Sequence, residues 1–246
     1  NLTIMIKSKN TNYENLVEQL DTKGNPEVRL VYQAENSIKV PGEKLGVFSA
    51  SFNPLTLAHI KIIELAERKI DLKEILFLLA KANVDKDIFG ATLAERLKVL
   101  KRYAQTQQNL SVAVSSHGRF IDKVTALSSV YPPDTEFYFI IGYDTLVRVF
   151  DSKYYTEMDK EVGELFAQSE FVVANRGKYG IKAVETFLEK PVCRKYSEKI
   201  HAVCLEKPYT RMSSTKVREY ISSEISIDEF VPTLVLKWIK ETGVYS

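Results

Sequence analysis

The sequence lacks the features that identify several classes of protein. Its two cysteines, Cys193 and Cys204, are too few for a disulfide framework or a metal-ligand set. The formal net charge is only +2, so the chain has no general electrostatic basis for binding nucleic acid or a membrane. No apolar run approaches the roughly 18 residues that a membrane span needs. The N-terminus turns polar after Ile6, unlike a secretory signal, so we expect a cytoplasmic protein.

Apolar residues are nonetheless plentiful, at 45% of the 246 residues against 27% that are charged. This balance is typical of a globular protein with a sizeable buried core. The length suits one large domain or two small ones. We find neither an internal repeat nor a low-complexity segment, so the fold class has to be inferred from the order of the individual strands and helices.

Short apolar runs alternate with amphipathic stretches along most of the chain. Nearly continuous apolar runs are typical of parallel strands that are buried on both faces. We expect such strands at residues 45–48, 74–79, 110–114, 136–141, 170–174 and 199–205. Helical periodicity predicts helices near residues 56–70, 93–103, 120–130, 143 onward, 181–189 and 213–222. Thr92 and Glu95 have the spacing of a capping box at the start of one of these helices.

Repeated strand–helix units predict an α/β fold: a Rossmann-like, doubly wound parallel sheet with helices on both faces and a C-terminal helical segment. We divide the chain into an N-terminal extension over residues 1–44, a main domain over 45–222, and a helical segment over 223–246 packed on that domain. An alternating run at 28–32 in the extension predicts one further strand. Ligands of doubly wound sheets bind beyond the carboxyl ends of the strands, so we expect the strand-end loops to surround one crevice.

The stretch from Leu45 to Ile60 combines a strand, a tight turn and the start of a helix. A helix start offers free N–H groups and a partial positive charge, which together bind phosphate. His59 lies in the first turn of this helix and adds a side-chain donor. Taken alone, His59 is better explained as a histidine at a capped helix start.

A second anion site is predicted at the start of the helix that follows Met212. Ser213, Ser214 and Thr215 supply hydroxyl groups, and Arg218 lies one turn further on, where its guanidinium can hold phosphate oxygens. Taken alone, these serines make an ordinary N-cap. Two phosphate sites at the ends of one sheet suit a polyphosphate such as ATP.

These stretches resemble a known superfamily of nucleotidyltransferases, which carries an (H/T)xGH signature near the N-terminus and an ISSTxxR signature near the C-terminus. The matching residues are 46–48, 51–54 and 56–59 for the first signature and 212–218 for the second. Residues 141–146 are similar to the GxDxL turn of nicotinamide or nicotinate mononucleotide adenylyltransferases. Residues 172–177 resemble the strand and "R-G" turn of those enzymes, and residues 94–97 resemble their ER-containing helix.

The resemblance implies an enzyme of NAD biosynthesis, an adenylyltransferase that transfers AMP from ATP to nicotinamide or nicotinate mononucleotide and releases pyrophosphate. Positioning and charge stabilisation would then carry the catalysis. The residues implied are His59 and Thr56 for catalysis, Ser51, Phe52, Ser213, Ser214, Thr215 and Arg218 for the ATP phosphates, and Gly142, Asp144 and Arg176 for the mononucleotide and its sugar. Mg²⁺ would be held by phosphate oxygens and water, so we name no protein ligand for it.

The chain departs from the usual signature at two positions. Thr56 replaces the first histidine and cannot carry its positive charge, although its hydroxyl can still donate to phosphate. Ala58 replaces the glycine, and its methyl group can crowd a nucleotide that approaches the backbone. Two alternatives therefore stay open: a cytidylyl- or adenylyltransferase for another phosphorylated acceptor, such as a pantetheine or glycerol phosphate, and a nucleotide-binding regulatory protein with weakened catalysis.

Several other residues have a plain explanation beside a functional one. Asp144 is equally well explained as a helix N-cap. We expect solvated side chains at Lys81 and Lys86, no substrate contact at His117, and a structural His201. We expect Tyr154, Tyr155 and Trp238 to be packing aromatics rather than base-stacking ones. The sequence decides neither the choice between acid and amide on the pyridine ring nor whether the chain forms a homo-oligomer.

Overall fold

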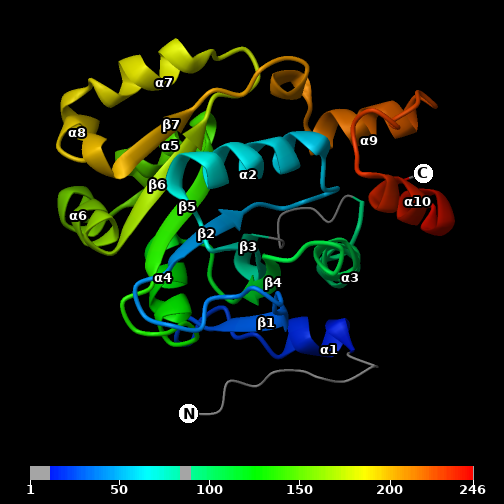
Figure 1. Cartoon of the computed structure of the whole chain (residues 1–246), viewed down its shortest axis with the longest axis horizontal. Helices are drawn as coiled ribbons and strands as arrows, with labels where there is room; N and C mark the ends of the chain where they lie inside the picture. Colours follow the sequence, from blue (N-terminus) through cyan, green and yellow to red (C-terminus); the bar gives the residue numbers. More distant parts are fainter. Residues whose placement is uncertain (1–11, 84–89, 246) are drawn as a thin grey trace.

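The computed structural model describes residues 12–83 and 90–245, which form one seven-stranded sheet with helices on both faces (Figure 1). The strands are β1 (Val28–Tyr32), β2 (Lys44–Ser49), β3 (Glu74–Ala80), β4 (Leu110–Ser115), β5 (Glu136–Gly142), β6 (Ser169–Ala174) and β7 (Ile200–Val203). The helices are α1 (Tyr13–Glu18), α2 (Leu57–Ile70), α3 (Leu93–Ala104), α4 (Phe120–Ser128), α5 (Tyr143–Val149), α6 (Met158–Gln168), α7 (Ile181–Leu188), α8 (Pro191–Arg194), α9 (Ser214–Ser222) and α10 (Thr233–Thr242).

The strand order β1-β4-β3-β2-β5-β6-β7 confirms the doubly wound fold. Strands β2 to β7 run parallel, and numbered from β2 they follow the Rossmann order 3-2-1-4-5-6. In the centre, Phe48 of β2 pairs with Phe77 of β3 on one side and Ile140 of β5 on the other. The chain changes direction across the sheet between β2 and β5, so the ligand crevice of this fold class lies at the ends of these two strands.

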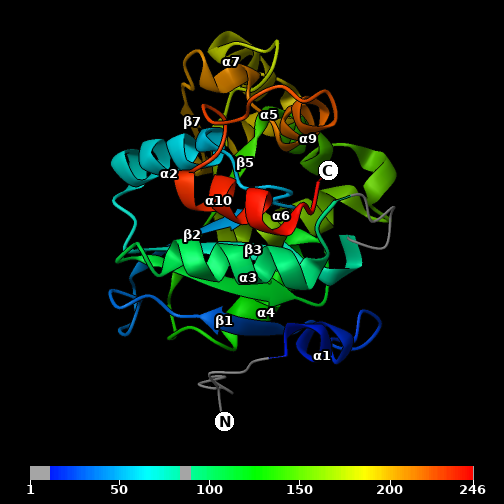
Figure 2. The ribbon, with the colours of Figure 1, turned by 90° about the vertical axis from the view of Figure 1, so that its right-hand side faces the viewer.

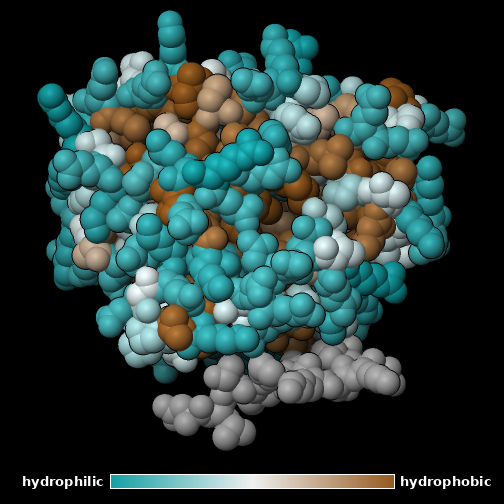
Figure 3. Space-filling view, in the orientation of Figure 1, coloured by the Kyte–Doolittle hydropathy of each residue, from teal (hydrophilic) through white to brown (hydrophobic). Residues whose placement is uncertain are grey.

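Each face of the sheet is covered by its own hydrophobic core. Alternate residues of a strand point to opposite faces, so Leu45 and Val47 of β2 enter one core while Phe48 enters the other. Helices α1, α2, α3, α9 and α10 cover the Phe48 side, and Figure 2 shows α2, α10 and α3 lying over this face. Helices α4 to α8 cover the opposite side. On the face of the molecule seen in Figure 3, hydrophilic residues predominate, with hydrophobic residues visible between them.

Part of the N-terminal extension belongs to the sheet itself. Strand β1 pairs antiparallel with β4, with Arg29 opposite Val114, and forms the edge next to α1 (Figure 1). An antiparallel edge strand needs no crossover helix, which is why a short chain segment can add it. The sequence indicates the strand at 28–32 but not the strand with which it pairs.

Most expected boundaries are confirmed to within two residues, and the last strand is shorter than expected. It ends at Val203, because the Leu205 N–H donates to Asn175 Oδ1 at 2.6 Å instead of continuing the ladder. The expected capping box of α3 is present: the Glu95 N–H donates to Thr92 Oγ1, and the Thr92 N–H donates to Glu95 Oε2. Within the described residues, we find no helix with the length and apolar character that crossing a bilayer requires.

Candidate functional site

The candidate site lies where the carboxyl ends of β2 and β5 meet. After Ser49 the chain makes a tight turn and enters α2, for which Thr56 is the N-cap. After Gly142 the chain enters α5 directly. The start of α2 and the start of α5 therefore flank the switch point, where doubly wound sheets bind their ligands.

The imidazole of His59 is buried and neutral. The backbone N–H of Thr56 donates to His59 Nδ1 at 3.0 Å, so Nδ1 carries a lone pair and the proton of the neutral ring is assigned to Nε2. Burial, together with the positive charge of Arg176, lowers the pKa of His59 to about 3. At neutral pH, His59 is therefore a hydrogen-bond donor through Nε2 rather than a cation.

Thr56 and His59 hold each other at the start of α2. The Thr56 hydroxyl lies 2.8 Å from His59 Nδ1 and also accepts from the His59 N–H at 3.4 Å. This is a capping box in which histidine takes the place of the usual acidic residue. Thr56 is completely buried, so its hydroxyl serves the helix start and the imidazole. From the sequence we expect this hydroxyl to donate to phosphate, whereas in the structure its contacts are with His59.

The turn between β2 and α2 is built around Phe52. Its φ of 45° lies in the left-handed region that large side chains seldom adopt. The ring is completely buried, with its centroid 5.3 Å from that of His59 and 4.5 Å from that of Phe77. Phe52 therefore packs beneath the turn, which leaves only its backbone to meet a phosphate. The neighbouring Ser51 is exposed, and its carbonyl accepts from Arg96 at 2.8 Å.

Helix α9 is bonded to the turn before α2, which brings the two signature stretches together. The Ser214 hydroxyl donates to the Pro54 carbonyl at 2.7 Å, and the Arg218 guanidinium donates to the Asn53 carbonyl at 2.6 Å. Ser213 caps α9 by accepting from the Lys216 N–H at 3.1 Å. The starts of α2 and α9 therefore lie at one place, as expected for a site that holds a polyphosphate.

The hydroxyl groups at the start of α9 differ in what they can still bind. The proton of Ser214 is used by the Pro54 carbonyl, so this side chain joins the two helices rather than donating to a ligand. Thr215 is exposed and accepts from Arg218 at 3.4 Å, which leaves its own proton for a ligand. Ser213 accepts a backbone bond and likewise keeps its proton.

Gly142, Asp144 and Arg176 come together as expected. Arg176 follows β6 and lies over the end of β5, where a Cβ on Gly142 would be 3.6 Å from its Cδ. Burial lowers the pKa of Arg176, and the negative charge of Asp144 opposes this effect. Gly142 is the N-cap of α5, which has no side-chain cap, so the alternative that Asp144 caps the helix is wrong.

A cleft of about 730 Å³ opens beside these strand ends. Its walls come from the end of β2, the loops after β3 and β4, and helices α4, α5 and α6. The lining residues are Ser49, Ala82, His117, Gly118, Arg119, Phe120, Ile121, Asp122, Lys123, Thr145, Arg148, Val149, Tyr154, Tyr155, Glu161 and Leu165. The segment 151–168 contributes one wall of the cleft. Tyr154 is 52% exposed there, unlike the buried Trp238, so it is not the packing aromatic that we expect from the sequence.

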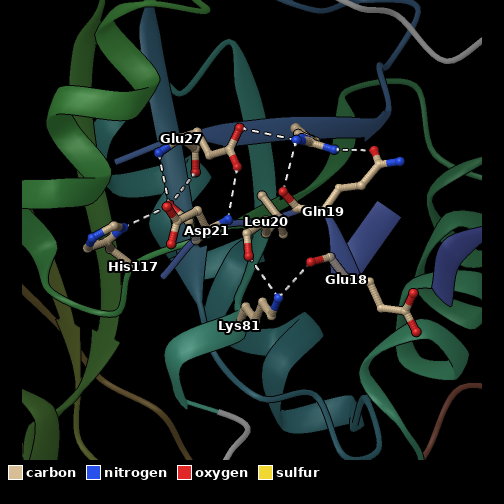
Figure 4. Close-up of polar contacts among 9 residues, drawn as sticks. Glu18, Gln19, Leu20, Asp21, Glu27, Lys81 and His117 are labelled. Atoms are coloured by element: carbon tan, nitrogen blue, oxygen red, sulfur yellow. Dashed lines mark hydrogen bonds and ion pairs between the residues drawn. The ribbon is translucent and has the colours of Figure 1, made fainter. Parts of the chain in front are cut away.

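The N-terminal segment is fastened to the loops at the rim of this cleft (Figure 4). Lys81, in the loop after β3, donates to the carbonyls of Glu18 and Leu20 at the end of α1. It is therefore not the solvated lysine that we expect from the sequence. The loop after β4 is tied in the same way, because the Glu27 N–H donates to Ser116 Oγ, which lies 2.8 Å from His117 Nδ1. Lys86 lies outside the described residues.

Some residues of the site are not identified from the sequence. Arg96 belongs to a stretch already matched to the superfamily, but its bond to the Ser51 carbonyl follows only from the tertiary structure. Tyr245, near the C-terminus, donates to Asn53 Oδ1 at 2.7 Å and has no signal in the sequence. Lys123, on the cleft wall, likewise belongs to no motif. His201 is structural as expected, paired with Glu170 at 2.7 Å.

Within residues 12–83 and 90–245, no cluster of three histidine, cysteine or acidic side chains is placed to hold a metal ion. Mg²⁺ keeps several water ligands and commonly binds through substrate phosphates. The residues at the two helix starts are hydroxyl, amide and basic groups, which suit phosphate oxygens rather than a bare cation. This donor set fits a metal ion that arrives already bound to a nucleotide.

Comparison with known proteins gives a consistent result. The cytidylyltransferase-like family model matches residues 47–220. The "Putative nicotinamide mononucleotide adenylyltransferase" of Schizosaccharomyces pombe is 27% identical over 224 residues, covering 85% of this chain and 88% of that protein. The "Probable nicotinate-nucleotide adenylyltransferase" of Listeria monocytogenes serovar 1/2a is 28% identical over 207 residues, covering 82% and 97%.

A solved structure shows the same fold. The Plasmodium falciparum nicotinic acid mononucleotide adenylyltransferase complexed with NaAD matches with a TM-score of 0.62 at 17% identity, covering 82% of this chain and 97% of that chain. The family model spans more than half of the 246 residues and includes the starts of both α2 and α9. The chain therefore belongs to the cytidylyltransferase-like family and is a nucleotidyltransferase that resembles the mononucleotide adenylyltransferases.

Proposed function

We propose that the chain transfers AMP from ATP to nicotinate or nicotinamide mononucleotide and releases pyrophosphate. The observation that carries this proposal is the pair of bonds from Ser214 and Arg218 to the turn before α2, which unites two helix starts beside His59. Relatives that are named nicotinate- or nicotinamide-nucleotide adenylyltransferases support a pyridine acceptor, and the chain matches them over most of their length. The cytoplasmic location expected from the sequence stays a prediction.

In the proposed reaction, a 5′-phosphate oxygen of the mononucleotide attacks the α-phosphorus of ATP. The bond from this phosphorus to the oxygen of the β-phosphate breaks, and pyrophosphate leaves with that electron pair. The attacking phosphate is already ionised at neutral pH, so the protein needs no general base. Its task is to align the two nucleotides and to stabilise the negative charge of the transition state.

The geometry of the switch point supports a role for each residue in the proposed reaction. Nε2–H of the neutral His59 donates to an α-phosphate oxygen, and Thr56 positions the imidazole through its bonds at Nδ1. The start of α9, with the hydroxyl groups of Ser213 and Thr215, receives the β- and γ-phosphates. Arg218 adds a positive charge there. A Mg²⁺ ion held by the ATP phosphates would offset part of their negative charge.

Gly142, Asp144 and Arg176 mark the boundary between the two nucleotides. The bare Gly142 leaves room for a sugar against the end of β5, and the exposed carboxylate of Asp144 can accept from sugar hydroxyls. The adjoining cleft of about 730 Å³ has the size of a small-molecule site, and we assign it to the mononucleotide.

A pyrophosphate-release assay tests the proposal. Purified protein with Mg²⁺ is given ATP or CTP, each with nicotinate mononucleotide, nicotinamide mononucleotide, or no acceptor. We expect release only with ATP and a pyridine mononucleotide together. Release with CTP, or with neither pyridine acceptor, contradicts the assignment and favours the transferase with another acceptor. Tight ATP binding without turnover favours the regulatory alternative.

The His59→Asn variant tests the proposed donor. The Asn Oδ1 can replace Nδ1 as the acceptor for the Thr56 N–H, while the Nε2 donor is lost. Removing one preorganised donor to a transition-state oxygen costs on the order of 10²–10³ in kcat. We expect a loss of this size with a KM for ATP that changes only a few-fold. An unchanged kcat excludes His59 from the proposed role.

A further inference from the structure

A lysine that pairs with no carboxylate of the described residues lies buried in the wall of the cleft. Lys123, in the first turn of α4, is only 3% exposed. Its Nζ donates to the Gly118 carbonyl at 2.7 Å and lies 5.1 Å from the centre of the Phe120 ring. In the part of the chain that the structure describes, no carboxylate lies within ion-pair distance of this ammonium. Two of its three protons remain for a ligand.

A buried ammonium with one backbone acceptor is costly for the fold. A charge that leaves water is normally paired, and Lys123 has no such partner within residues 12–83 and 90–245. Burial lowers the pKa of Lys123 to about 8, which the nearby charge of Asp122 only partly offsets. Lys123 is a buried cation whose charge no carboxylate in the described part of the chain balances, and it lines a cleft. An anionic ligand bound in this cleft would balance the charge and so explain why the lysine is buried there.

The surroundings of Lys123 favour an anion that is attached to a flat, apolar ring. Helix α4 begins at the cleft, and its N-cap, Arg119, supplies no side-chain cap, so the free N–H groups of the first turn remain for a ligand. Arg119 itself pairs with Glu161 of α6. The aromatic rings of Phe120 and Tyr154 also line the cleft. A ring with a single carboxylate matches these aromatic side chains together with the buried ammonium of Lys123.

The position of the cleft decides which end of the mononucleotide reaches Lys123. Under the proposed function, the 5′-phosphate must lie beside His59 at the end of β2. Ser49, at the end of β2, lines the same cleft, and Lys123 belongs to α4 on the opposite face of the sheet from α2. The pyridine ring, at the other end of the mononucleotide, therefore extends towards α4.

We propose that Lys123 pairs with the carboxylate of the pyridine ring and makes the enzyme prefer nicotinate mononucleotide over nicotinamide mononucleotide. The inference rests on the proposed function and deepens it. The carboxylate of nicotinate compensates the ammonium, whereas the neutral carboxamide of nicotinamide leaves the buried charge unpaired. Discrimination of this kind arises from the unpaired group in the complex with the wrong ligand.

The test is the ratio of kcat/KM for nicotinate mononucleotide to kcat/KM for nicotinamide mononucleotide, at saturating ATP. Lys123→Met removes the charge at similar length, Lys123→Gln keeps a polar end, and Lys123→Arg keeps the charge. We expect the ratio to favour nicotinate in the wild type and to fall at least tenfold in the Met and Gln variants, with kcat/KM for nicotinamide mononucleotide within threefold of wild type. Lys237→Met, on the exposed face of α10, is the matched control and should leave the ratio unchanged.

Each other outcome has a definite meaning. A wild type that prefers the amide, or an unchanged ratio in Lys123→Met and Lys123→Gln, overturns the inference. An equal loss with both acceptors also overturns it, because Lys123 then contacts the shared phosphate or only supports the fold. Partial unfolding of a variant lowers both kcat/KM values alike and leaves their ratio readable. Absence of turnover with both acceptors in the wild type is instead a failure of the proposed function.

Discussion

The buried, neutral His59 makes the stability of this protein depend on pH in a predictable way. Its pKa is about 3 in the folded chain against an ordinary value of 6.5. Between these two values the unfolded chain binds a proton that the folded chain does not. The contribution of His59 to the free energy of unfolding is therefore fully present above pH 6.5 and is lost as the pH falls towards 3. At about 1.4 kcal/mol for each pH unit, the whole window amounts to about 5 kcal/mol.

The His59→Asn variant isolates this contribution, because it keeps an acceptor for the Thr56 N–H but has nothing to protonate. Acidic side chains also titrate in this window, but they do so in both proteins and cancel in the difference. Relative to the variant, we expect the wild type to lose about 1.4 kcal/mol of unfolding free energy for each unit below pH 6.5, or about 2.7 kcal/mol at pH 4.5.

Urea unfolding at pH 7, 6, 5 and 4.5, followed by the fluorescence of Trp238, measures the effect. Trp238 is the single tryptophan of the chain and is buried, so it reports the loss of the core. Val203→Ala, which shortens a buried side chain of β7 and removes no titratable group, serves as the control and should keep the acid dependence of the wild type. Parallel curves for the wild type and His59→Asn would refute the reasoning, because they would mean that His59 titrates alike in both states.

Two further predictions concern the starts of elements near the site. Thr56→Val removes the hydroxyl that caps α2, so we expect a loss of about 1 kcal/mol in unfolding free energy, while Thr56→Ser stays within about 0.5 kcal/mol of wild type; equal effects of the two variants would contradict the capping role. Lys81→Met removes the donor to the Glu18 and Leu20 carbonyls, so we expect faster hydrogen exchange in α1 while α3 keeps its protection; unchanged exchange in α1 would show that Lys81 does not hold that segment.

Local patterns in the sequence were sufficient to predict where most strands and helices of the fold lie. Continuous apolar runs mark strands that are buried on both faces, and the positions of these runs fix six of the seven strands. The Thr92–Glu95 capping box was predicted because both of its partners lie within one helical turn. Short-range steric and hydrogen-bonding preferences decide such features, so a single sequence is enough to identify them.

The sequence was less informative about what each site residue does. It indicated His59 as a donor, but the neutral state of the ring depends on burial beneath Phe52 and on the charge of Arg176, which lies more than one hundred residues away along the chain. It assigned Ser214 to phosphate, whereas the hydroxyl donates to Pro54 and joins two helices. These outcomes depend on which long-range neighbour competes for the same hydrogen bond, and local patterns do not contain that information.

The sequence by itself therefore determined the doubly wound sheet, the two helix starts that form the candidate phosphate site, and the resemblance to nucleotidyltransferases. Only the tertiary structure decided that Lys81 fastens the N-terminal segment and that Lys123 is buried in the cleft wall with no carboxylate partner in the described part of the chain. Both are single lysines in no motif, and the sequence does not distinguish them from solvated ones. The cost of burying a charge arises only when distant segments close around it, so the role of these lysines follows from packing.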